Sequence, residues 1–137
     1  MKMFISYRRA DSAPYAGRLR DGLEAHFGAG SVFFDVNTIE AGENFPSALG
    51  TALSLSDIVM VVIGPNWTNV TFPQGGRRLD DPKDLVRAEI RTALDRNVEI
   101  IPVLVGGAAM PKPDQLPDEL KPLSTRNVLI FPVMVFL

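Results

Sequence analysis

One run of apolar residues constrains the fold more than any other part of this 137-residue chain. Residues 57–63 read DIVMVVI, a segment that carries no charge after Asp57 and is rich in β-branched side chains. A strand that is apolar at every position, rather than at every second one, is typical of a parallel sheet covered by helices on both faces. The run therefore predicts an α/β protein.

Strand and helix patterns alternate along the rest of the sequence. Further short apolar runs that predict strands lie at 2–7, 31–34, 98–105 and 127–131. Between them, apolar residues recur at helical spacing, for example at every fourth position over 15–27, in a helix that we expect to begin at Ser12. The alternation predicts one parallel sheet with helices on both faces.

Composition and charge argue against several kinds of site. The chain has no cysteine and only one histidine, which argues against disulfides, a metal centre or a histidine-based triad. A formal net charge of -2, without runs of Lys and Arg, argues against nucleic-acid binding. We find no signal peptide and no apolar run long enough to cross a membrane, and we expect a soluble cytoplasmic protein without a cofactor.

Two segments fit no regular element. Residues 68–82 are polar and show no period, and a structureless segment of this length is usually functional or mobile. The tail 131–137 is apolar and uncharged, and it could be core, a partner surface or the stump of a longer chain. We expect a single domain over 1–137 and favour the last interpretation for the tail.

The first apolar run ends in two arginines, Arg8 and Arg9. Ligands of parallel sheets bind at the carboxyl ends of the strands, near the point where the strand order reverses beside the first strand. Guanidinium groups suit phosphates, so this pair predicts an anion site. The alternative is that both are solvated loop charges.

A glutamate lies on the apolar side of a predicted helix that runs from about residue 82 to 97. At about 100° per residue, Glu89 falls inside the apolar stripe, between Leu85 and Ala93, whereas the other charged residues fall opposite. Glutamate is rarely buried without a partner or a task, which makes Glu89 a candidate catalytic residue. The alternative is a glutamate at the edge of the stripe that reaches solvent or pairs with one of the two arginines.

Three motifs resemble those of Toll/interleukin-1 receptor (TIR) domains, and together they span nearly the whole chain. FISYRR at 4–9 resembles the first-strand motif, and DVNTIEAGENF at 35–45 resembles the BB loop that follows the second strand. LDDPKDLVRAEI at 79–90 resembles the helix that bears the catalytic glutamate of NAD-cleaving, bacterial members. The resemblance implies a flavodoxin-like three-layer sandwich whose five-stranded parallel sheet has the order 2-1-3-4-5.

The resemblance also implies an activity, cleavage of the bond between nicotinamide and ribose in NAD+, with or without cyclisation of the product. Glu89 carries over as the catalytic residue. Positions around the nucleotide site or its loop are matched by Arg8, Arg9, Asp35, Glu40, Gly42 and Phe45. Leu85 stands where some NAD-cleaving relatives have tryptophan, so it would pack on a ribose or ring without aromatic stacking.

One carboxylate is sufficient for this reaction. Ordinary glycosidases need a second carboxyl group because the leaving oxygen must be protonated. Nicotinamide leaves as a neutral molecule, so the remaining demand is to stabilise positive charge on the ribose or to orient water.

The family points to two functions. The first is an NAD+-consuming effector of a bacterial antiviral or cell-suicide system, activated by self-assembly with other TIR domains and by a sensor domain or protein, in cis or in trans. The alternative is a non-catalytic adaptor that binds other TIR domains through residues 35–45. A phospho-receiver of the same topology does not fit, because Ile63 and Gly64 stand where its acceptor aspartate should end the third strand.

Overall fold

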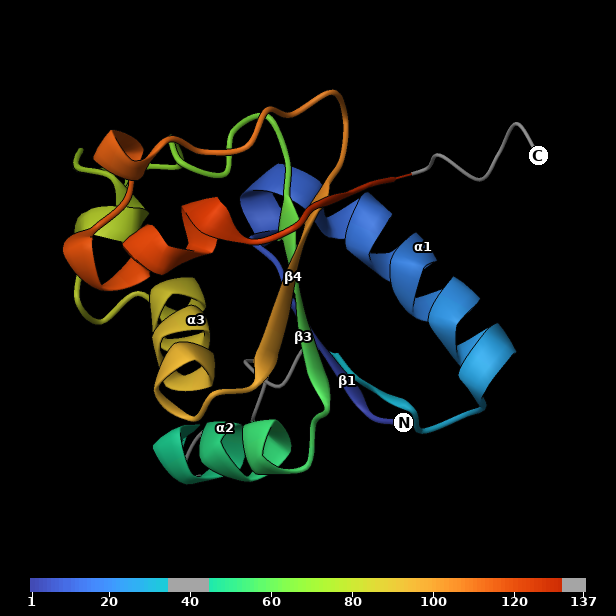
Figure 1. The fold of residues 1–137 in the computed structure, drawn as a ribbon. Coiled ribbons are helices and arrows are strands. Elements are labelled where there is room, and N and C mark those ends of the chain that lie inside the picture. Colours follow the sequence, from blue (N-terminus) through green and yellow to red (C-terminus); the bar gives the residue numbers. More distant parts are fainter. Residues whose placement is uncertain (35–44, 132–137) are drawn as a thin grey trace.

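The computed structural model describes residues 1–34 and 45–131 and shows one five-stranded parallel sheet (Figure 1). The strand order is β2-β1-β3-β4-β5, which confirms the predicted fold. The strands are β1 (Met3–Ser6), β2 (Val32–Phe33), β3 (Ile58–Ile63), β4 (Glu99–Leu104) and β5 (Leu129–Ile130). The two outer strands are shorter than the sequence predicts.

Helices cover both faces of the sheet and complete a three-layer sandwich. The long helix α1 (Arg9–Phe27) lies on one face, and α2 (Phe45–Ser54) and α3 (Leu85–Asp95) lie on the other (Figure 1). In the described part of the chain, three short 3-10 helices join the α3 side: η2 (Arg78–Asp80), η3 (Pro113–Gln115) and η4 (Asp118–Thr125).

The central strands divide the core into two apolar clusters. Because successive side chains point to opposite faces of a strand, alternate residues of β1 and β3 belong to different clusters. The cluster against α1 takes Met3, Ile5, Met60 and Val62 from these strands. The cluster against α2 and α3 takes Phe4, Val59, Val61 and Ile63. Strand β3 is therefore buried on both faces, as the apolar run at 57–63 predicts.

The start of α1 differs from the prediction. A first turn already begins at Arg9, and the backbone leaves the helical region at Ser12 (φ −148°, ψ 23°) before the main helix continues. Two residues later, Pro14 supplies no backbone N–H, which suits it to the first turn of a helix. Ser12 therefore marks the beginning of the main helix, although within the described residues its hydroxyl has no hydrogen-bond partner.

A carboxylate ties this first turn to the end of β3. Asp11 accepts hydrogen bonds from the backbone N–H groups of Gly64 and Asn66, both at 2.8 Å. A Cβ atom at Gly64 would lie 2.6 Å from the nearer Asp11 carboxylate oxygen, so this contact requires glycine. The contact holds the segment after β1 beside the segment after β3.

Within residues 1–34 and 45–131, no helix combines the length and apolar character needed to cross a membrane. The tail 132–137 lies outside the described residues.

Candidate active-site cleft

A cleft of about 420 Å³ opens where β1 gives way to α1 and α3 begins. This is the carboxyl edge of the sheet, where ligands of parallel sheets bind. Three predicted site residues, Arg8, Arg9 and Leu85, line it together. The other lining residues are Tyr7, Ala10, Val70, Arg78, Lys83, Asp84 and Val86.

The lining of the cleft is strongly cationic. Among the described residues that form it, four side chains are cationic and one, that of Asp84, is a carboxylate. The whole chain has a formal net charge of -2, so positive charge is concentrated at this place. A cleft lined by one sign of charge raises the local concentration of ligands of the opposite sign.

The single carboxylate is already paired. Nη1 and Nη2 of Arg8 donate to the two carboxylate oxygens of Asp84 at 2.9 and 2.8 Å, and each side chain is only 6% exposed. Asp84 is also the N-cap of α3, because it accepts a hydrogen bond from the Arg87 backbone N–H at 3.1 Å. Arg8 therefore links the end of β1 to the start of α3, and its role in holding a pyrophosphate stays a prediction.

Glu89 is buried on the apolar face of α3, as the helix pattern predicts, and is 1% exposed. On β1, Ser6 alternates with Ile5 and so faces α3. Its hydroxyl donates a hydrogen bond to Glu89 Oε1 at 2.8 Å. The interpretation in which Glu89 reaches solvent is wrong. The carboxylate lies one helical turn beyond Leu85, and Glu89 is not one of the residues that line the cleft.

Leu85 departs from the helix pattern. It belongs to the predicted apolar stripe but is 41% exposed, unlike Val86 and Ile90, which are buried. Its side chain contributes an apolar surface to a cleft that also has four cationic side chains in its lining. An aliphatic group in this place can pack on a sugar or a ring.

The segment 68–82, which we predicted to lack structure, contains an ordered hairpin over residues 70–78, here called the arm. Thr71 pairs with Arg77 in an antiparallel bridge, and the Arg78 N–H donates to the Val70 carbonyl at 2.9 Å. The turn uses Gly75 and Gly76 at φ 99° and 85°, a region that glycine adopts without strain. The adjacent glycines are a turn signal that the sequence analysis did not use, although Arg77 and Arg78, which follow them, give no strand pattern.

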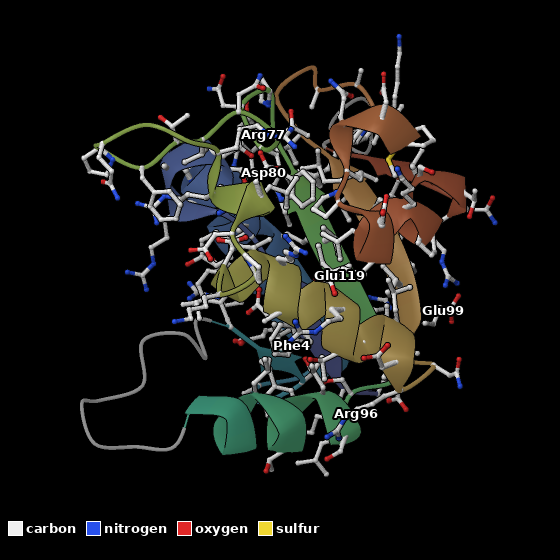
Figure 2. The ribbon with its side chains drawn as sticks, turned by 90° about the vertical axis from the view of Figure 1, so that its left-hand side faces the viewer. Phe4, Arg77, Asp80, Arg96, Glu99 and Glu119 are labelled. Carbon is white, nitrogen blue, oxygen red and sulfur yellow. The ribbon has the colours of Figure 1, made fainter. Side chains whose placement is uncertain are left out.

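Adjacent arginines on the arm have different surroundings. Arg77 forms an ion pair with Asp80 at 2.7 Å and donates to the carbonyls of Thr68 and Gln115 at 3.3 and 3.0 Å (Figure 2). The hydrogen bond between these two side chains lowers the pKa of the Asp80 carboxyl group and raises the pKa of the Arg77 guanidinium group. Arg78 instead lies over the Phe72 ring, with 4.8 Å from its guanidinium carbon to the ring centroid, and lines the cleft.

The remaining predicted site residues are not placed by the structure. Asp35, Glu40 and Gly42 lie outside the described residues, and Phe45 begins α2 without a described side chain. Arg78, Lys83 and Val70 line the cleft although the sequence analysis did not single them out.

Comparison with known proteins gives a family and a fold. The family model described as "TIR domain" matches residues 3–129. The NAD(+) hydrolase sarm1 of Drosophila melanogaster is 28% identical over 127 residues, which cover 93% of this chain. The chain spans only 9% of the length of that curated relative.

Solved structures of TIR domains share the fold. The TIR domain of the Toll-related receptor TRR-2 from Hydra magnipapillata matches with a TM-score of 0.62 and 17% identity, over 94% of this chain and 82% of that one. The TIR domains of the activated Roq1 resistosome match with a TM-score of 0.58 and 18% identity, over 86% of this chain and 65% of that one. At these identities the likeness concerns the fold alone.

Proposed function

The chain belongs to the TIR domain family, and from this premise we propose that it is an NAD+ glycohydrolase that breaks the bond between nicotinamide and ribose. One observation carries the proposal: a buried glutamate, held by the Ser6 hydroxyl at 2.8 Å, lies one helical turn from a cationic cleft. The 28% sequence identity to a protein named as an NAD(+) hydrolase supports the proposal.

The proposed mechanism uses a single carboxylate. As the glycosidic bond breaks, positive charge grows on the ribose, and Glu89 stabilises it electrostatically. Nicotinamide leaves as a neutral molecule and needs no acid, in contrast to the leaving oxygen of an ordinary glycoside. Water, oriented by the same carboxylate, then adds to the ribose carbon and loses a proton to that carboxylate, which passes it on to solvent. Arg8 and Arg9 hold the pyrophosphate, and Leu85 packs on the ribose.

Because Glu89 is buried, the proposed enzyme needs an activation step. At 1% exposure this carboxylate cannot touch a substrate in the state seen here, so the reaction requires a rearrangement at the start of α3. We propose that self-assembly with other TIR domains, through residues 35–45, selects the open state, and that a sensor domain or protein in cis or in trans triggers it. In this proposal the chain is the effector of a bacterial antiviral or cell-suicide system and acts in the cytoplasm.

The decisive test is to incubate the purified chain with NAD+ and identify the products by mass. We expect nicotinamide together with ADP-ribose or a cyclised isomer, at a specific activity that rises with protein concentration. Glu89→Gln keeps the shape and removes the charge, and it should lower the rate at least about a thousandfold, or about 4 kcal/mol. Glu99→Gln, at the exposed start of β4, is the matched control.

Two outcomes would contradict the proposal. Turnover by Glu89→Gln within about tenfold of the wild-type rate would remove this residue from the chemistry. If no nicotinamide is released at any protein concentration, while TIR–TIR binding through residues 35–45 persists, the chain is the non-catalytic adaptor instead.

A further inference from the structure

The arm presents one arginine to the cleft and uses its neighbour as an anchor. Arg77 is held by one carboxylate and two carbonyl oxygens, which fixes the base of the arm against η2 and η3. The paired backbone then directs Arg78 to the opposite side, where it lines the cleft. A guanidinium group held on a hydrogen-bonded hairpin is better prepared for a ligand than one on an unpaired loop.

Arg78 and its neighbour in the cleft, Lys83, have no anionic partner among the described residues. Over residues 1–34 and 45–131, neither side chain forms an ion pair, in contrast to Arg8, Arg77 and Arg87. The contact of Arg78 with the Phe72 ring orients the guanidinium group but leaves its charge unmatched. Two cations with unmatched charge, supplied by η2 and by the segment before α3, therefore meet at one cavity.

The positive charge of the cleft exceeds what one pyrophosphate bridge requires. Each phosphate of that bridge carries one negative charge, and the proposed function assigns the bridge to the arginines at the end of β1. Because Asp84 neutralises Arg8, the four cations and one carboxylate of the lining give a net charge of +3, of which Arg78 and Lys83 supply two, against the two negative charges of the bridge. A further phosphate on a ribose would add about 1.5 to 2 negative charges near neutral pH.

We propose that Arg78 and Lys83 form a phosphate subsite of this cleft, which rests on the proposed function because it takes a phosphate group of the same nucleotide. Arg78 supplies the planar donor pair and Lys83 a point charge, a combination suited to phosphate oxygens. The phosphate comes either from the pyrophosphate bridge or from a 2′-phosphate on the adenosine ribose. In both cases Arg78 determines affinity for the nucleotide and takes no part in bond breaking.

The test is equilibrium binding, which does not depend on turnover. Titration calorimetry with ADP-ribose and with its 2′-phosphorylated form compares the wild-type chain with Arg78→Gln and Lys83→Gln. We expect each substitution to raise Kd about tenfold for at least one probe, the size of a lost charge-assisted hydrogen bond. Arg91→Gln removes the same charge from a part of α3 outside the cleft and is the matched control.

The two probes separate the sources of the phosphate. If the substitutions raise Kd equally for both probes, the subsite binds the pyrophosphate. If they raise Kd for the 2′-phosphorylated probe alone, the subsite binds the 2′-phosphate. A Kd unchanged within twofold for both probes, in variants whose melting temperature equals that of the wild type, overturns the inference. If binding responds as expected but NAD+ is not cleaved, the subsite stands and the glycohydrolase proposal fails.

Discussion

The floor and the rim of the cleft are built on opposite principles. We call the floor the two buried hydrogen-bonded pairs Arg8–Asp84, which lines the cleft, and Ser6–Glu89, which does not; all four residues are at most 9% exposed. The rim consists of Arg9, Arg78 and Lys83, cations that water reaches at least in part. Buried pairs fix geometry and are costly to disturb, whereas exposed charges attract a ligand at little cost to stability. Variants of the floor should therefore change stability and rate, and variants of the rim should change affinity.

The largest effect on stability is expected at the buried ion pair. Asp84→Asn leaves the Arg8 charge buried without its partner and weakens the cap of α3, so the free energy of unfolding should fall by about 3 kcal/mol. Urea denaturation measures this change. Asp118→Asn, in an ion pair whose aspartate side chain is 98% exposed, is the control and should cost little. A loss below about 1 kcal/mol for Asp84→Asn would show that the pair does not hold the floor.

The next effect is on the rate, and it requires the proposed activity. Ser6→Ala removes the hydroxyl that orients the Glu89 carboxylate, so kcat should fall about 10- to 100-fold with little change in KM. Ser6→Thr keeps a hydroxyl and should recover much of the rate, which a purely structural role would not predict. Values of kcat within twofold of the wild-type rate for Ser6→Ala would contradict the positioning role.

A smaller effect separates the two adjacent arginines. Arg9→Ala on the rim should raise KM for NAD+ about 3- to 10-fold without loss of stability, and the effect should shrink in high salt. Arg8→Ala belongs to the floor and should be destabilising, as Asp84→Asn is. Steady-state kinetics and urea denaturation of both variants provide the comparison. Identical behaviour of the two variants would remove the distinction between floor and rim.

The smallest effect concerns the anchor of the arm. Arg77 lowers the pKa of Asp80, so this ion pair adds stability that is fully present above the ordinary carboxyl range near pH 4 and is lost as the pH falls through the lowered value. The pair is largely exposed, and its contribution should stay below about 1 kcal/mol. The unfolding free energies of the wild type and Asp80→Asn should differ at pH 6 and approach one another as the pH falls below the ordinary carboxyl range near pH 4. A constant difference would contradict this linkage.

The sequence predicts those features that depend on local periodicity. Uncharged β-branched runs give the central strands, and rotation by 100° per residue places Glu89 on the buried face of α3. Arg8 and Asp84 are 76 positions apart, and no local pattern links them. The arm is too short to show a period, and Arg78 and Lys83 reach the cleft only because the hairpin and the start of α3 meet there.

The contact between Asp11 and Gly64 has an evolutionary consequence. The carboxylate occupies the space that a side chain at position 64 would need, and it satisfies two backbone N–H groups there. Neither residue can be exchanged alone without a clash or an unpaired donor. In a set of related sequences the two positions should therefore vary together, with glycine at 64 retained wherever an acid is retained at 11.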